Sequence, residues 1–208
     1  MAGAQAMVFA VAGALIAASP ACAEAPLRVR GVVTGFENGS ITVMSPGEGV
    51  AVLKTGSDTS YAYVVPSSLD AIRIDDFVGA AVKGPPRAMV AVELAIVPAN
   101  MRAGRISYYG WDPLPDPTAS RMAQKTATHM TNGIVSAEKS GATGGTLTIT
   151  YGGGNGSFRV DVPPNASVVR YVLADRSAVT IGCRVVIKTS PGERAGLVTV
   201  GRGVAPPM

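Results

Sequence analysis

Apolar and polar residues alternate along several short segments of this sequence. In 146–151 and 157–162 every second residue is apolar, and in 90–96 the apolar set is Val90, Val92, Leu94 and Ile96. Strict alternation turns one set of side chains toward a core and leaves the other in water, which is typical of antiparallel strands. Beyond the first 23 residues, the only helical element expected is one short turn at 67–72. The pattern therefore predicts an all-β fold.

The residues between these segments suit tight turns. Asn38-Gly39 supplies two residues that tolerate a positive φ, as a type I′ hairpin requires. The run 152–156, four glycines around Asn155, predicts a looser hairpin loop rather than a phosphate cradle, because an alternating strand and not a helix follows it. Pro163-Pro164 ends a strand by removing ladder donors.

The sequence is organised as an internal duplication. The segment RGVVTGFENGSITVM (30–44) matches NGIVSAEKSGATGGTLTITY (132–151), and 69–82 matches 176–188. Gly31 corresponds to Gly133, 102 residues later, and Ile74 to Ile181, 107 residues later. We expect two copies, at 28–100 and 130–204, each a small antiparallel β-barrel of the oligonucleotide-fold type, with a β-sandwich as the alternative.

A connector at 101–129 separates the two copies. Pro113, Pro115 and Pro117 stiffen it and exclude a helix at its centre. It also concentrates aromatic residues in a sequence that has few of them, and the candidate binding residues are Tyr108, Tyr109, Trp111 and Asp112. Two interpretations stay open. The rings either plug the seam between the two copies or form an exposed platform for a sugar, a peptide or a partner protein.

The first 23 residues predict a signal peptide. An apolar run at 7–18 is too short to cross a bilayer, and Ala21-Cys22-Ala23 fits the small-residue cleavage pattern. Acylation of Cys22 is the weaker alternative. No later stretch predicts a membrane span, so we expect a periplasmic or secreted protein. The net charge of +4 is spread without basic runs, which argues against nucleic-acid binding.

No residue pattern predicts catalysis. His129 is the only histidine, and it is expected at the surface just before a strand. Cys183 is expected to be a buried, unreactive thiol. Asp75-Asp76 is interpreted as a solvated turn rather than as an acid/base pair or an ion site. A soft copper(I) site would have to combine His129 and Met130 with Met101 or Met122.

Several short motifs, in order, resemble a family of small exported proteobacterial proteins that contain two copies of a β-rich domain of unknown function. The motifs are Gly31-Val32-Val33 with Ser40-Ile41-Thr42-Val43, Pro66-Ser67-Ser68-Leu69-Asp70, Met101-Arg102, Trp111-Asp112, Met130-Thr131-Asn132-Gly133, Val162-Pro163-Pro164 and Pro206-Pro207-Met208. Some members carry the automated name "metal ABC transporter permease", which implies membrane spans that this sequence does not predict. The connector is more polar and richer in glycine in that family, so Tyr108-Tyr109 departs from it. The resemblance implies no activity.

Together these features predict a non-enzymatic exported module of the bacterial envelope, binding or structural, which needs no cofactor and contacts an envelope protein or a glycan. The alternative is a periplasmic copper carrier that uses Met and His.

Overall fold

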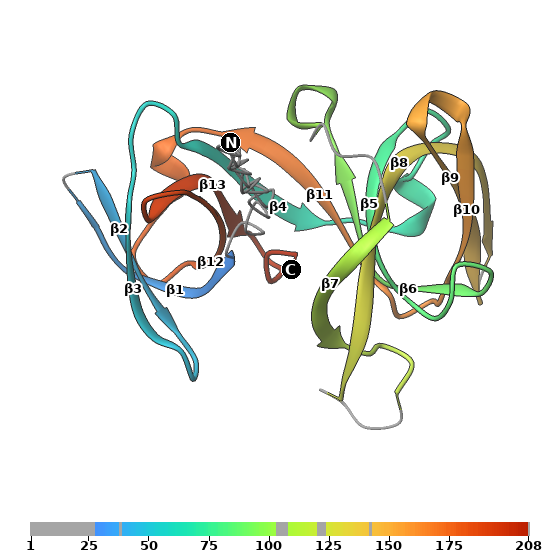
Figure 1. The fold of residues 1–208 in the computed structure, drawn as a ribbon, viewed down its shortest axis with the longest axis horizontal. Helices are drawn as coiled ribbons and strands as arrows, with labels where there is room; N and C mark the ends of the chain where they lie inside the picture. Colours follow the sequence, from blue (N-terminus) through green and yellow to red (C-terminus); the bar gives the residue numbers. More distant parts are fainter. Residues whose placement is uncertain (1–27, 38, 103–107, 120–123, 142, 208) are drawn as a thin grey trace, which may run out of the picture.

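The computed structural model describes residues 28–37, 39–102, 108–119, 124–141 and 143–207, and it is all-β, as predicted (Figure 1). The only helical segments in these residues are short 3-10 turns at Leu69–Ala71, Ala99–Met101, Gly152–Gly154 and Arg176–Ala178. The strands are β1 (Arg28–Glu37), β2 (Ser40–Ser45), β3 (Gly49–Lys54), β4 (Ser60–Pro66), β5 (Phe77–Lys83), β6 (Met89–Val97), β7 (Tyr108–Pro115), β8 (Lys125–Gly141), β9 (Gly144–Tyr151), β10 (Gly156–Val162), β11 (Ser167–Ala174), β12 (Arg184–Ser190) and β13 (Arg194–Gly201).

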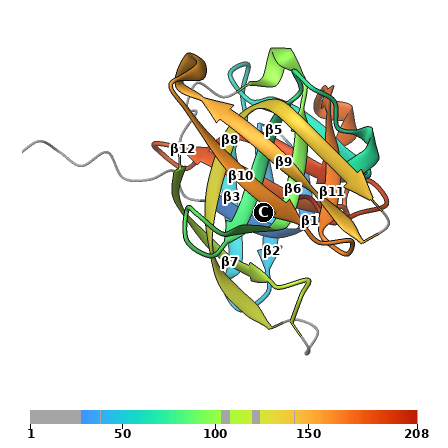
Figure 2. The ribbon, with the colours of Figure 1, turned by 90° about the vertical axis from the view of Figure 1, so that its right-hand side faces the viewer.

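Five strands form a closed barrel, which we call the ring. They follow the order β10-β9-β8-β5-β6, and β10 then pairs with β6 in parallel through Val160 with Met89 and Asp161 with Val90. Figure 2 shows the ring facing the viewer. Its interior is filled by fully buried aliphatic side chains, among them Leu94, Leu147 and Ile149. The alternation in 146–151 and 157–162 thus gives the inward-facing residues of β9 and β10.

A second group of five strands, which we call the second set, runs in the order β13-β12-β1-β2-β3. Its ends meet at one residue pair, Arg194 with Lys54. Inside lies a separate core that includes Val33, Ile41 and Ile187. Cys183 packs against this core but is only half-buried, so the expectation of a buried thiol was wrong.

Two strands connect the ring to the second set. β4 pairs with β13 in parallel, β11 pairs with β6 in parallel, and β4 and β11 pair with each other in antiparallel orientation. The pair at the middle of that contact is Val64 opposite Tyr171. A single hydrogen-bonded sheet therefore runs from one core to the other (Figure 1).

Pairings in the second set reappear in the ring at the offsets found in the sequence. Gly31 lies opposite Val185 on β12, and Gly133 lies opposite Val78 on β5. The bulge between Val33 and Gly35 likewise recurs between Val135 and Ala137. The duplication stays a prediction, and these matched registers support it. Neither copy closes on itself, however, because 28–54 pairs with strands after 183 and 77–97 pairs with strands between 125 and 162.

The phase of alternation in β6 differs from the prediction. The residues that enter the ring core are Met89, Ala91, Leu94 and Ile96. A bulge between Ala81 and Val82 leaves Val92 without a direct partner, which shifts the alternation by one residue. Val92 consequently points out of the ring, toward β7. Val90 is half-buried rather than in the core.

Turn residues adopt the left-handed conformation at matching places in the two halves. Asp75 has a φ of 71°, and Gly182, 107 residues later, has a φ of 88°. The Asp75 amide donates to the Val135 carbonyl at 2.9 Å, and the Gly182 amide donates to the Val33 carbonyl at 2.8 Å. Asp75-Asp76 is therefore part of a turn, as expected. Gly39 has a positive φ, and Asn38 lies outside the described residues.

Among the described residues no helix is long and apolar enough to cross a membrane. The predicted signal peptide at 1–23 lies outside them.

Candidate binding site at the seam

The predicted binding residues lie on β7, which pairs with β8 of the ring and faces the second set (Figure 1). The centre of the connector is thus a strand, with a bulge between Trp111 and Leu114 where Pro113 interrupts the ladder. Because side chains alternate along β7, Tyr108 and Tyr109 point in different directions. We call the region between β7, the outer face of the ring and the second set the seam.

Tyr108 packs against the ring and does not reach the seam cluster. Its ring stacks on His129 of β8, with centroids 4.7 Å apart and planes at 9°, and it also contacts Phe158. His129 consequently lies within a strand and against an aromatic ring, and its expected place before a strand was wrong.

Tyr109 and Trp111 belong to the seam. They contact each other edge to face at 5.8 Å, and both pack against a small buried cluster made of Ala81, Val92, Leu114 and Met130. The guanidinium of Arg28, on β1, lies 3.8 Å from the centroid of the Trp111 ring. Both rings are half-buried. Both rings therefore lie in the seam, and one face of Trp111 is covered by an arginine of the second set.

Asp112 fixes the position of β7 against the second set. Arg28 donates through Nε to a carboxylate oxygen of Asp112 at 3.1 Å, and Arg30 donates through Nη2 at 2.5 Å. Thr128 donates to the backbone carbonyl of Asp112 at 2.6 Å. Partial burial opposes ionisation of the carboxyl group, but the hydrogen bonds from the two arginines outweigh it and lower the pKa of Asp112 below its usual range.

Two adjoining hollows open in the seam. The first, of about 200 Å³, is floored by Gly79, Ala81 and Ala95 and walled by Tyr109 and Trp111. The second, of about 480 Å³, is lined mainly by aliphatic residues, with Arg30 and Arg184 at its edge. Glu93 lines both hollows.

The C-terminal segment 204–207 lies between these hollows. Val204, Ala205 and Pro206 line the larger one, and Pro207 lines the smaller. Pro206 and Pro207 are buried. Figure 1 shows this end of the chain between the ring and the second set. The seam therefore already holds a proline-containing segment of the chain itself.

Comparisons with protein-family models, curated proteins and solved structures found no match to this chain. The function is therefore inferred from the geometry of the seam.

The geometry separates two of the proposed copper ligands, His129 and Met130. His129 stacks on Tyr108, whereas Met130, the next residue along β8, points into the seam cluster. Met101 lines the smaller hollow with Met130, and Met122 lies outside the described residues. Within the described ranges no three His, Cys, Asp or Glu side chains gather closely enough to hold a metal ion.

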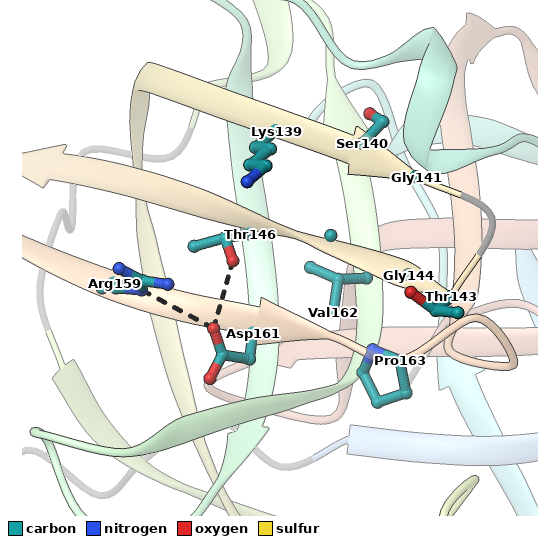
Figure 3. Close-up of a pocket in the computed structure, with 11 residues that line it drawn as sticks. Lys139, Ser140, Gly141, Thr143, Gly144, Thr146, Arg159, Asp161, Val162 and Pro163 are labelled. Carbon is teal, nitrogen blue, oxygen red and sulfur yellow. Dashed lines mark hydrogen bonds and ion pairs between the residues drawn. The ribbon is translucent and has the colours of Figure 1, made fainter.

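A third hollow, of about 430 Å³, lies at the outer end of the β8–β9 hairpin and is polar (Figure 3). Asp161 at its floor accepts from Thr146 at 3.2 Å and forms an ion pair with Arg159 at 3.7 Å. Both side chains of the ion pair are well exposed, so water screens it. Asp161 and Arg159 are thus paired with each other in the hollow, and it gives a weaker case for a ligand site than the seam does.

Sequence reasoning identified part of the seam. Tyr109, Trp111 and Asp112 were expected as a group because they lie close together in the sequence. Arg28 and Arg30 were missed because they lie more than 80 residues away, and nothing in the spacing links them to β7. The one signal that could have pointed to the C-terminal segment was Pro206-Pro207, since consecutive prolines favour an extended segment that suits an aromatic groove.

Proposed function

We propose that this protein is a non-enzymatic, exported binding module of the bacterial envelope, and that the seam binds an extended apolar peptide segment of a protein partner. The observation that carries the proposal is the pair of apolar hollows on either side of segment 204–207, whose Pro206 and Pro207 are buried. Ligand sites are typically concave and apolar, with a few polar groups that set orientation. Here Asn132, Glu93 and Lys188 are the polar groups of the smaller hollow.

We expect the ligand to contain proline because segment 204–207, which already lies in the seam, contains two prolines. Proline-rich segments are extended before they bind, so they lose little conformational entropy, and aromatic side chains line the grooves that bind them. Tyr109 and Trp111 lie at the smaller hollow, which Pro207 also lines. The polar nature of sugars fits this lining less well, since Gly79, Ala81 and Ala95 form the floor.

Trp111 is the only tryptophan, so its fluorescence reports on the seam directly. The probe is a blocked decapeptide with Val-Ala-Pro-Pro at its centre, titrated into the purified protein. We expect a saturable change in emission that weakens at least roughly tenfold in Tyr109→Ala, because one wall of the smaller hollow is removed. Ile181→Ala, on an exposed turn with 70% of its surface accessible, should bind as the unaltered protein does.

Two outcomes would count against the proposal. The first is an emission that does not change at millimolar peptide. The second is a saturable response to maltohexaose in place of the peptide, which would make the ligand a glycan. Export is tested separately by fractionating cells and sequencing the N-terminus of the mature chain, and a start at Met1 in the cytoplasm would contradict it.

A further inference from the structure

The face of the β1–β12 pair that points out of the second core forms one wall of the seam. Side chains two positions apart on a strand, and side chains directly opposite each other in an antiparallel pair, share a face. Six residues share this one, in three opposite pairs: Arg28 with Lys188, Arg30 with Val186 and Val32 with Arg184. Arg28 covers Trp111, and the other five line the hollows. Four of the six are cationic, and we call this face the basic wall.

The carboxylates of the seam do not balance the basic wall. Asp112 accepts from both Arg28 and Arg30. Glu93, on β6, lines both hollows, and it is the only acidic residue that lines either one within the described ranges. Four cations thus face two carboxylates, so the described part of the seam holds two more positive charges than negative ones. The segment 204–207 is uncharged and does not change this balance.

Several donors on the basic wall remain without acceptors. The side chains of Arg184 and Lys188 are exposed, and they form no hydrogen bond or ion pair with any residue that the structure describes. Arg30 donates to Asp112 through Nη2, but its buried Nε finds no acceptor among the same residues. A buried donor left unpaired costs free energy, which an oxygen of a bound ligand recovers. Because Arg30 and Arg184 both line the larger hollow, an acidic group bound there lies beside two guanidinium groups.

We propose that the peptide segment bound in the seam is acidic, and that Arg184 and Lys188 select for carboxylates placed beside its prolines. This inference rests on the proposed function, because it names the chemistry of the same ligand. The two cations lie where the prolines of segment 204–207 lie, since Pro206 and Arg184 line the larger hollow and Pro207 and Lys188 the smaller one. Opposite charges across an interface speed association with the correct partner, and like charges exclude a wrong one.

The test uses three blocked decapeptides with Val-Ala-Pro-Pro at the centre, flanked on both sides by glutamates, by glutamines or by lysines. Emission from Trp111 gives the dissociation constant of each peptide at low and at high ionic strength. We expect the glutamate peptide to bind roughly tenfold more tightly than the glutamine peptide, and the lysine peptide to bind most weakly. These differences should shrink as salt is added, because the cations that select the ligand are exposed to water.

A matched pair of double variants assigns the preference to the basic wall. Arg184→Glu with Lys188→Glu should reverse the order, so that the lysine peptide binds most tightly. Lys139→Glu with Arg159→Glu makes the same change of net charge at the third hollow, on exposed residues, and should leave the order as it is in the unaltered protein. Circular dichroism confirms that both variants remain folded.

The outcomes separate this inference from the proposed function. If the glutamine peptide binds and the glutamate peptide binds no more tightly, the inference is overturned and the proposed function stands. If none of the three peptides changes the emission, both are overturned. An order of affinities that the seam variant leaves unchanged, or that the control variant also reverses, would assign the preference to the net charge of the whole protein and would likewise overturn the inference.

Discussion

Arg28 and Asp112 lie 84 positions apart in the sequence, and the arginine Nε donates to the carboxylate at 3.1 Å. The same arginine covers the ring of Trp111. One side chain of β1 thus holds both the charged and the aromatic residue of β7, and through them the second set contacts a strand that is hydrogen-bonded to the ring.

We expect Asp112→Asn to lower the free energy of unfolding by about 1 kcal/mol at neutral pH, a value reduced for the partial exposure of the pair. The lowered pKa of Asp112 means that its stabilising effect is present above its unfolded pKa near 4 and is lost as the pH falls through the folded value. Urea unfolding of both proteins between pH 2 and pH 7 should show curves that converge at acid pH. Asp58→Asn, which removes an exposed pair with Arg194, is the control and should change stability less.

Gly31 and Gly133 have no room for a side chain. A Cβ at Gly31 would lie 2.1 Å from the carbonyl oxygen of Met44, and one at Gly133 would lie 2.3 Å from that of Thr150. Alanine at either position should therefore destabilise the protein by about 1–3 kcal/mol, because the backbone of the neighbouring strand must move. Thermal unfolding checks this. Gly110→Ala has open space around its Cβ and should be nearly neutral, and equal melting temperatures for all three variants would contradict the argument.

Variants in the left-handed turns can measure the cost of backbone conformation apart from the cost of side-chain packing. Gly182→Ala places a Cβ in open space but at a φ of 88°, so we expect a loss of about 1 kcal/mol from backbone strain alone. Asp75→Gly, at the matching turn, relieves the same strain and should leave stability unchanged or raise it slightly. Chemical unfolding of the two variants gives the comparison. A Gly182→Ala protein as stable as the original would show that this turn relaxes freely.

Tyr171 lies opposite Val64 at the middle of the β4–β11 contact. Burial raises the pKa of its hydroxyl to about 12, although a hydrogen bond with Thr199 lowers it and the charge of Glu93 raises it further. A raised pKa means that stability is fully present below the unfolded value near 10 and falls as the pH rises toward 12. Absorbance titration at 295 nm should show one tyrosine ionising last, and that step should be missing in Tyr171→Phe. A last step that survives in Tyr171→Phe would assign it to another tyrosine.

The two halves should not fold separately. A fragment of residues 28–102 lacks β12, which pairs with β1, and β13, which pairs with β4; a fragment of residues 108–207 lacks β5 and β6, which complete the ring. We expect each fragment alone to give a disordered circular dichroism spectrum and an equimolar mixture to regain β-sheet signal as a 1:1 complex. A cooperatively folded single fragment would show that a copy can close on itself.

The sequence by itself determined the all-β class, several of the strands and the turns of this protein, but not strand β7 within the predicted connector. Alternation involves residues only two positions apart, and a glycine permits a left-handed turn through its own φ angle. Both features can therefore be recognised from a short stretch of sequence. The exception in β6 shows the limit, because the bulge at Ala81 and Val82 depends on how two strands meet and not on either strand alone.

Only the tertiary structure decided which strands complete each barrel and what surrounds Trp111. The two predicted copies present equivalent edges, and β1 could pair in the same register with a strand of either copy. In the structure β1 pairs with β12 and β5 pairs with β8, so the arrangement is crossed between the two predicted copies. Arg28 and Pro207 reach the seam through that choice, and for this reason no pattern within the connector could have placed them there.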